Sequence, residues 1–212
     1  MLFEELNINT PLRNAIADMG YIYPTPIQEA SFSVIMSGRD VVGIAQTGTG
    51  KTIAYLLPLL RQLSFSKQKQ PRVLILVPTR ELVVQVVTEL EKLTSYMNLR
   101  SAGVYGGANI NKQDEAVFNG LDILIGTPGR VYDLAMKGVL SFKSIKKLVI
   151  DEVDEMLNLG FRPQVVNILE VLPTKRQNVL FSATLSEDVE ALFSEFFYSP
   201  EKIEIAPHGT PL

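Results

Sequence analysis

Short runs of consecutive apolar residues recur along the chain, at 41–44, 73–77, 123–125, 148–150 and 179–181. Strands that helices cover on both faces have this pattern, whereas strands with one solvent-exposed face alternate apolar and polar residues. Stretches with helical spacing separate these runs, at 52–63, 80–97, 111–119, 128–137, 162–172 and 187–197. Strands that alternate with helices indicate the α/β class, so we expect a parallel β-sheet flanked by helices.

Two similar segments near the start of the chain predict helix N-termini. Thr10-Pro11 and Thr25-Pro26 each place a hydroxyl that can cap a helix before a proline that suits the first helical position. Gly20 and Gly38 stand where a glycine commonly ends a helix. The chain shows no repeat and no internal boundary, so we expect one domain over residues 1–206, with 207–212 as the start of a linker.

The composition excludes several kinds of site. The chain has no cysteine and one histidine, His208, which excludes a zinc finger, a thiol nucleophile, a Ser-His-Asp triad and a multi-histidine metal site. No apolar run approaches the roughly 20 residues of a membrane helix. The first residues also lack the features of a signal peptide, so we expect a cytoplasmic protein with no membrane partner. A net charge of −3 argues against coating nucleic acid by bulk charge, so any nucleic-acid site must be local.

The loop after the first apolar run has the pattern of a phosphate-binding loop. Residues 45–52 read AQTGTGKT, with alanine where the pattern begins with glycine. Glycines let backbone N–H groups turn toward phosphate oxygens, and the helix start adds partial positive charge. We expect Lys51 to reach the β- and γ-phosphates and Thr52 to ligate Mg²⁺. The rest of the loop would surround the phosphates with Thr47, Gly48, Thr49 and Gly50; a glycine-rich turn without a ligand is the alternative.

An acidic segment, DEVD at 151–154, follows the apolar run at 148–150. In phosphate-loop enzymes an aspartate at such a strand end holds Mg²⁺. We expect Asp151 to hold the metal through water, and Glu152 to orient or deprotonate the attacking water. The alternative is a solvated helix N-terminus, where the helix dipole favours acidic residues.

Segments found in one order carry a family resemblance: PTPIQ (24–28), AQTGTGKT (45–52), PTREL (78–82), Gly106-Gly107, TPGR (127–130), DEVD (151–154) and SAT (182–184). Over roughly residues 2–206 the chain resembles the first RecA-like domain of a DEAD-box ATP-dependent RNA helicase. Among relatives it is most similar to the bacterial RhlE-like group. The resemblance implies a RecA-like P-loop NTPase domain, ATP and Mg²⁺ as cofactors, and RNA as the partner. Val153 departs from the family pattern, which has alanine at this position, so two extra methyl groups must be accommodated.

The resemblance also assigns residues around the adenine base. A glutamine amide can donate to adenine N7 and accept from its N6 amino group, and the resemblance gives this role to Gln28. It gives base stacking to Tyr21, with Tyr23 as a second candidate, and Phe3 matches the isolated aromatic before this motif. From the residues alone, the favoured interpretation is that Gln28 is an exposed helix residue and that the tyrosines are packing residues.

Three loops after predicted strands carry helix-start N–H groups, hydroxyls or arginine, all of which can bind phosphate. Their residues are Pro78, Thr79, Arg80, Gly106, Gly107, Thr127, Pro128, Gly129 and Arg130. No row of aromatic residues accompanies them, which favours contact with a nucleic-acid backbone over sequence reading. Ordinary helix capping is the alternative for the threonines. The resemblance assigns these residues to the RNA backbone, with a lower rank for Arg80, which can instead hold the loops together.

The segment SAT ends the last apolar run with the hydroxyls of Ser182 and Thr184, which can bond to Asp154 on a neighbouring strand end. In the family this contact couples nucleotide binding to RNA binding and domain closure; a strand-end Ser/Thr turn is the alternative. The resemblance further implies a second RecA-like domain in cis, absent from this chain, that supplies arginines to the γ-phosphate. We therefore expect a monomer that binds ATP or ADP weakly, hydrolyses ATP very slowly and unwinds nothing on its own.

Other function classes stay open from the residues alone. A small-molecule kinase would need an acceptor pocket and a lid, for which the sequence gives no signal. A scaffold without activity would not need Lys51, Thr52, Asp151 and Glu152. A DNA helicase is the nearer alternative, because backbone contacts by themselves do not require the 2′-hydroxyl.

Overall fold

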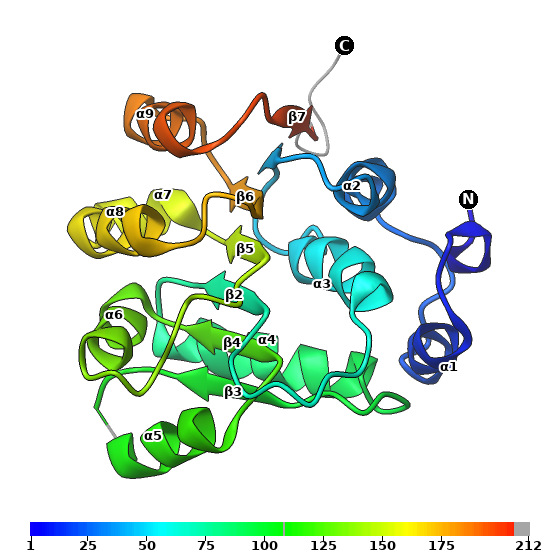
Figure 1. Ribbon diagram of the computed structural model, residues 1–212. Helices are drawn as coiled ribbons and strands as arrows, with labels where there is room; N and C mark the ends of the chain where they lie inside the picture. The colour runs from blue at the N-terminus through cyan, green and yellow to red at the C-terminus, as the bar shows by residue number, and fades with distance from the viewer. Residues whose placement is uncertain (108, 206–212) are drawn as a thin grey trace.

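The computed structural model describes residues 1–107 and 109–205. Its centre is a seven-stranded sheet in the order β3-β4-β2-β5-β6-β1-β7, and all neighbouring strands run parallel (Figure 1). The strands are β1 (Val41–Ile44), β2 (Val73–Leu76), β3 (Ser101–Val104), β4 (Ile123–Gly126), β5 (Lys147–Ile150), β6 (Gln177–Ser182) and β7 (Glu201–Glu204). The α/β class and the parallel sheet expected from the apolar runs are confirmed.

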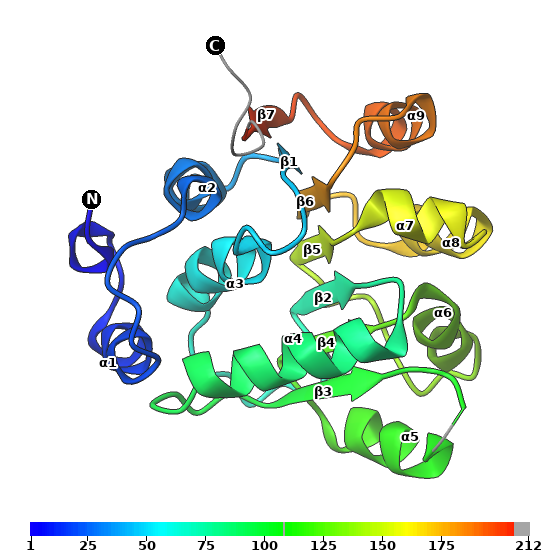
Figure 2. The same ribbon diagram turned by 180° about the vertical axis from the view of Figure 1, so that it is seen from behind.

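Helices cover both faces of this sheet, and each layer has its own apolar core. One core joins the sheet to a 3-10 helix η1 (Phe3–Glu5) and to α1 (Thr10–Asp18), α2 (Pro26–Met36), α3 (Lys51–Gln62) and α4 (Arg80–Leu93). The other joins it to α5 (Ile110–Asn119), α6 (Pro128–Met136), α7 (Val153–Asn158), α8 (Arg162–Val171) and α9 (Glu187–Phe196). Figures 1 and 2 show the two layers from opposite sides.

The apolar pattern places most elements to within one or two residues, and the exceptions have physical causes. The expected helix over 80–97 ends at Leu93, where Thr94 serves as its C-cap. Strands β3 and β7 lie outside the predicted apolar runs because β3 reads SAGV and β7, at the other edge of the sheet, reads EKIE with a single apolar residue. Edge strands bury less side-chain surface, so their composition need not be continuously apolar.

The helix termini give one correction. Thr10 is the first residue of α1 rather than its cap, because Asn9 Oδ1 accepts from the Leu12 amide at 3.3 Å. Thr25 does precede α2 as its N-cap, and the glycines after these two helices adopt left-handed backbone, with φ 73° at Gly20 and φ 82° at Gly38. A left-handed residue at this position is the usual end of a helix.

The amino ends of the strands are joined by buried polar contacts. Asp122, before β4, accepts from Arg72 Nη2 at 3.1 Å and from Arg100 Nη2 at 3.2 Å. Lys147 Nζ, at the start of β5, donates to Gln62 Oε1 at 2.6 Å and to Gln177 Oε1 at 2.7 Å. These contacts hold the strands in register, so the carboxyl ends, where parallel sheets bind ligands, come together at the opposite edge.

Within residues 1–107 and 109–205, no helix combines the length and the apolar character needed to cross a bilayer. The expected linker start at 207–212, which includes His208, lies outside the described residues.

Candidate functional site

The loop between β1 and α3 adopts the backbone that a phosphate loop requires. Gly48 and Gly50 have left-handed φ values of 80° and 89°, which a residue with a Cβ rarely adopts. A Cβ on Gly50 would also collide with the Gln28 amide, so glycine is needed there for two reasons. Thr49 Oγ1 donates to the Gln46 carbonyl at 2.7 Å and closes the loop before α3 begins at Lys51.

Lys51 carries a buried charge that no described residue neutralises by a hydrogen bond or an ion pair. The residue is 5% exposed, and among the described residues Nζ has no hydrogen-bond acceptor. Burying an ammonium group without a partner is costly, so such a group is retained where a ligand completes it. Lys51 lines the same cavity as the loop glycines, where a polyphosphate would provide the missing acceptors.

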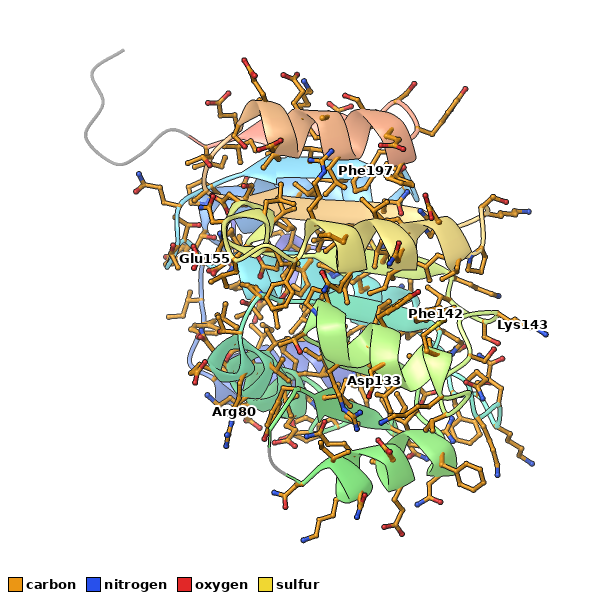
Figure 3. The ribbon with its side chains drawn as sticks, turned by 90° about the vertical axis from the view of Figure 1, so that its left-hand side faces the viewer. Arg80, Asp133, Phe142, Lys143, Glu155 and Phe197 are labelled. Carbon is orange, nitrogen blue, oxygen red and sulfur yellow. The ribbon has the colours of Figure 1, made fainter. Side chains whose placement is uncertain are left out.

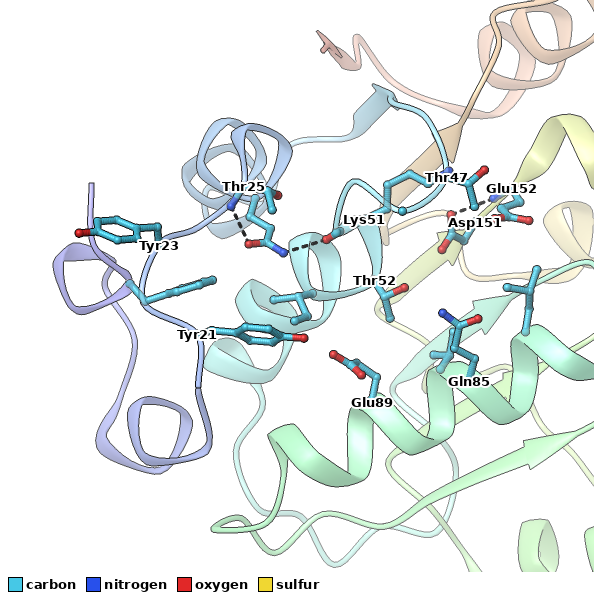
Figure 4. Close-up of a pocket in the computed structure, with 17 residues that line it drawn as sticks. Tyr21, Tyr23, Thr25, Thr47, Lys51, Thr52, Gln85, Glu89, Asp151 and Glu152 are labelled. Carbon is cyan, nitrogen blue, oxygen red and sulfur yellow. Dashed lines mark hydrogen bonds between the residues drawn. The ribbon is translucent and has the colours of Figure 1, made fainter. Parts of the chain in front are cut away.

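Asp151 and Glu152 face this cavity from the end of β5 (Figure 4). The Glu152 amide donates to Asp151 Oδ1 at 2.9 Å. Glu152 has φ 52° and ψ 48°, a left-handed conformation that is uncommon for a residue with a side chain. Such backbone is often found at functional sites. Here it turns the chain sharply between β5 and α7, with both acidic side chains lining the cavity.

Burial raises the pKa of Asp151 to about 6, because its carboxylate has little access to water. The nearby Lys51 ammonium opposes this rise, and the Glu152 carboxylate adds to it. Burial also raises the pKa of Tyr55, whose hydroxyl lies beneath the loop close to Asp151 and Thr52. Water therefore has little access to the region under the phosphate loop, and each charge there strongly affects the protonation of its neighbours.

The donor set fits a magnesium ion that is held mainly by phosphates and water. Thr52 and Asp151 line one cavity, whereas the described residues contain no cluster of three or more His, Cys, Asp or Glu side chains suited to a metal. Mg²⁺ keeps several waters and commonly takes one or two protein oxygens together with substrate phosphates. The buried carboxylate and the hydroxyl suit that role.

The cavity extends from the phosphate loop to the aromatic residues near the N-terminus and has a volume of about 420 Å³. Tyr21 points toward its interior and lies 6.5 Å from Phe3, measured between ring centroids. Tyr23 is 69% exposed and points away from Lys51 in Figure 4, so it lies at the outer rim. The structure thus places Tyr21 in the better position to stack on a base.

Gln28 is held in a fixed orientation. Its Oε1 accepts from the Thr25 amide at 2.9 Å, and its Nε2 donates to the Gly50 carbonyl at 3.1 Å. A carboxamide has two acceptor lone pairs and two N–H donors, so each end keeps capacity for a further hydrogen bond. The same side chain therefore links helix α2 to the phosphate loop and still faces the cavity.

Helix α4 also contributes to this cavity, which the sequence motifs did not indicate. Its residues there are Leu82, Gln85, Val86 and Glu89. Their spacing of three, four and seven positions puts them on one face of the helix. That periodicity was the available signal, but it is the same spacing that packs a helix against a core.

A second cavity, of about 520 Å³, lies beside the first along the carboxyl edge of the sheet. Residues from all three candidate RNA loops line it: Pro78, Arg80, Gly106, Thr127, Gly129 and Arg130. Thr79 Oγ1 accepts from the Leu82 amide at 3.3 Å as the cap of α4, Pro128 is buried, and Gly107 is exposed. Arg80 is exposed, and its guanidinium lies 4.9 Å from the Tyr105 ring centroid.

Arg130 lies in this region without presenting its charge. Its side chain is 4% exposed, and it forms ion pairs with Asp114 of α5 and Asp133 of α6. The guanidinium therefore ties two helices together beneath the loops. Direct contact of Arg130 with RNA stays a prediction, and it requires at least one of these pairs to open.

The ends of β5 and β6, beyond the first cavity, are joined through Asp154. Its Oδ2 accepts from the Thr184 amide at 3.1 Å and from Thr184 Oγ1 at 3.0 Å. Ser182 is fully buried at the end of β6, and its hydroxyl has no hydrogen-bond partner among the described residues. Of the two hydroxyls considered from the sequence, Thr184 makes the contact in this structure.

Comparison with known proteins places this geometry in a family. The family model described as DEAD/DEAH box helicase matches residues 25–192, most of the chain. The chain belongs to the DEAD/DEAH box helicase family. A crystal structure of a DEAD box protein from the hyperthermophile Methanococcus jannaschii superposes with a TM-score of 0.91 at 36% identity, covering 96% of this chain and 56% of that one. The RecA-like fold expected from the resemblance is therefore confirmed.

Curated relatives in this helicase family have similar identities. The DEAD-box ATP-dependent RNA helicase CshA of Streptococcus pneumoniae is 39% identical over 206 residues, which cover 97% of this chain and 39% of that protein. The ATP-dependent RNA helicase DeaD of Escherichia coli is 39% identical, covering 96% of this chain and 32% of its own length. The chain thus spans less than half of these relatives. Membership of the RhlE-like group stays a prediction.

Proposed function

We propose that this chain is the ATP-binding half of an ATP-dependent RNA helicase. The observation that carries the proposal is the buried Lys51 ammonium, which finds no acceptor in the residues that the structure describes and shares one cavity with Asp151 and Glu152 after β5. This arrangement leaves a positive group without an acceptor beside a carboxylate that can hold a metal. A nucleotide polyphosphate with Mg²⁺ supplies both missing partners.

Lys51, Thr52, Asp151 and Glu152 each have a role in this proposal. Lys51 and the loop N–H groups bind the phosphate oxygens, while Thr52 and Asp151 hold Mg²⁺, which would neutralise charge on the phosphates. Glu152 orients the attacking water or accepts its proton. Its fixed backbone keeps the carboxylate at the cavity after β5. The roles follow from general phosphoryl-transfer chemistry applied to the residues in place.

The carboxyl-edge loops are proposed to bind the RNA backbone. Arg80, Gly106, Gly107, Thr127 and Gly129 offer an exposed or half-exposed surface of cation, backbone and hydroxyl groups. Arg130 would act mainly by holding α5 and α6 beneath those loops. The contact of Thr184 with Asp154 would connect this surface to the nucleotide cavity.

The complete enzyme is proposed to need a second RecA-like domain in cis, which would supply arginines to the γ-phosphate. An arginine finger typically contributes 10³–10⁵ in rate, so this chain alone should hydrolyse ATP very slowly. The proposal includes a monomeric, cytoplasmic protein. The names of the relatives support RNA rather than DNA as the nucleic acid.

Nucleotide titration of the chain tests the proposal. ADP should bind and GDP should bind at least about tenfold more weakly, because one bidentate base contact is worth roughly 1–3 kcal/mol. Gln28→Ala should reduce the difference between the two nucleotides. The control Gln68→Ala changes a glutamine in the loop before β2 and should keep the preference. Equal affinity of the parent chain for ADP and GDP would contradict the adenine assignment.

A further inference from the structure

The amino edge of the sheet, opposite to the nucleotide cavity, carries a row of basic residues. The first residues of five strands are in register across the sheet: Ser101, Ile123, Val73, Lys147 and Gln177. The residues directly before them therefore also form a line, in the order Arg100, Asp122, Arg72, Lys146 and Arg176. Four of these are basic, and neighbouring positions are about 4.8 Å apart because strand spacing sets the distance.

The loops around this row add the exposed lysines Lys67, Lys69, Lys143 and Lys175 to Lys146 of the row itself, which is also exposed. Within the described part of the chain, none of them forms an ion pair. Asp122 is the one carboxylate in the loops of this edge, and it is buried and already paired with two arginines. The loops meant are 64–72, 119–122, 137–146 and 172–176. We call this surface the basic edge.

The loops of the basic edge are connected, so their charges lie together. The Ser141 amide donates to Gln70 Oε1 at 3.0 Å, and the Lys146 amide donates to the Arg72 carbonyl at 2.9 Å. The Leu121 amide donates to the Lys69 carbonyl at 2.9 Å. Figure 3 shows Lys143 on the side of the molecule opposite to Arg80 and Glu155. The basic edge is thus separate from the carboxyl-edge loops.

This concentration of positive charge stands out on a chain whose net charge is −3. Exposed acidic residues gather elsewhere, above all on α9 with Glu187, Asp188, Glu190 and Glu195. Glu170, in the last turn of α8, is an exposed carboxylate close in sequence to the Lys175 loop. The surface is therefore divided by charge, and the basic edge is attractive to a polyanion.

Two exposed aromatic rings accompany the lysines. Phe65 is 63% exposed and Phe118 is 70% exposed, and Lys69 Nζ lies 5.8 Å from the Phe118 ring centroid. Exposed aromatic rings among cations are the usual means by which proteins bind unpaired bases, because the rings stack on bases while the cations contact phosphates. A duplex would not offer its base faces to these rings.

We propose that the basic edge is an accessory binding surface for single-stranded RNA. The inference rests on the proposed function, since an enzyme acting on RNA has unpaired RNA at hand. A strand of four residues spans roughly 13 Å, so the two edges are close enough for one RNA molecule to reach both. The basic edge would hold a flanking single-stranded segment in a way that does not depend on the nucleotide.

Binding of a labelled unstructured RNA, measured by fluorescence anisotropy without nucleotide, tests this surface. The variant carrying Lys67→Gln and Lys143→Gln should bind roughly tenfold more weakly at low salt. The slope of log affinity against log salt should become shallower by about 1.4, since each lost contact to a single strand contributes about 0.7. A control variant carrying Arg13→Gln and Lys202→Gln removes the same charge elsewhere and should change the affinity less than twofold.

A second variant tests the aromatic rings. Phe65→Ala with Phe118→Ala should weaken binding of the RNA severalfold while leaving the salt slope unchanged, because stacking involves no phosphate contact. Equal losses in the lysine variant and its charge control would overturn the proposal, as would unchanged affinity in the phenylalanine variant. The proposal would also be overturned if the lysine variant bound RNA normally and differed only in self-association without RNA. The basic edge would then be a contact with α9 of a second copy of the chain.

ADP titration of the same variants separates this inference from the proposed function. All of them should bind ADP as the parent chain does, because the mutated residues lie outside the nucleotide cavity. Absence of ADP binding in every variant, with the RNA effects intact, would reject the proposed function alone. Normal ADP binding without the RNA effects would reject the accessory surface alone.

Discussion

At the scale of single residues, the nucleotide cavity is built from groups that lack full sets of partners. The buried Lys51 ammonium has no acceptor in the described part of the chain, and Asp151 is a buried carboxylate whose pKa is raised to about 6. Such groups are unfavourable without a ligand, and under the proposed function phosphate oxygens and a metal would complete them. The sequence predicted which residues these are, because glycine spacing and a strand-end acid are local signals.

Asp151→Asn should stabilise the empty chain at neutral pH. The folded carboxyl binds its proton more tightly than the unfolded one, whose ordinary pKa is 3.8. Its contribution to stability is therefore full below about pH 4 and lost as the pH rises through about 6. The neutral amide avoids this loss, which is at most on the order of 3 kcal/mol. Urea unfolding without nucleotide or Mg²⁺ should show a gain at pH 7.5 that shrinks at pH 5; a gain of the same size at both would refute the assignment.

Other residue-level features were not visible in the sequence. The residues of α4 in the cavity have the spacing of a packing face, so Gln85 and Glu89 carried no distinct signal. The pairing of Arg130 with Asp114 depends on how α5 and α6 meet, which is a tertiary contact. Asn9 rather than Thr10 caps α1, and the sequence could not distinguish these two neighbouring residues because both side chains are good caps.

At the scale of elements, buried polar contacts hold the strand register that brings the site together. Asp122 accepts from Arg72 and Arg100, which precede β2 and β3, and thereby fixes three adjacent strand starts. Asp154 and Thr184 do the same at the carboxyl edge. The order of the strands follows from these and other non-local contacts, so an apolar pattern can predict the strands without giving their order.

Asp122→Ala should destabilise the chain by about 3 kcal/mol, because it leaves two arginines without their buried partner. Burial by itself raises the pKa of Asp122, but hydrogen bonds from Arg100 and Arg72 outweigh it and lower the pKa below the ordinary value. The stability from this carboxylate is therefore present above pH 4 and lost as the pH falls further. Chemical unfolding at pH 7 measures the loss of stability, and Asp122→Asn should lose less stability than Asp122→Ala. An unchanged unfolding midpoint for the alanine variant would contradict the role of Asp122 in holding the strand starts together.

Val153→Ala tests whether the first turn of α7 is overpacked or well filled. Val153 is fully buried in the core beneath α7 and α9, where the family pattern has alanine. Removing two methyl groups should cost about 1–2 kcal/mol of stability, because burial of each carbon contributes about 0.8 kcal/mol. Thermal unfolding should show a lower midpoint. A higher midpoint would mean that the valine strains its neighbours, and ADP affinity should stay unchanged in either case.

At the scale of the whole molecule, the two proposed functions lie at opposite edges of the sheet. The carboxyl edge holds the nucleotide cavity and the candidate RNA loops, whereas the amino edge carries the structural ion pairs and the basic edge. The chain spans less than half of its curated relatives. Composition gave the net charge but not this division of charge, because the basic residues come from separate loops.

The central claim is that the phosphate loop and the end of β5 form a single Mg²⁺–nucleotide site. Calorimetric titration of ADP with and without Mg²⁺, on the parent chain and on Asp151→Asn, tests it most directly. We expect Mg²⁺ to strengthen ADP binding by the parent, and this enhancement to disappear in Asp151→Asn while metal-free ADP still binds. An Mg²⁺ enhancement of equal size in both proteins would contradict the account, because the metal would then be held without Asp151.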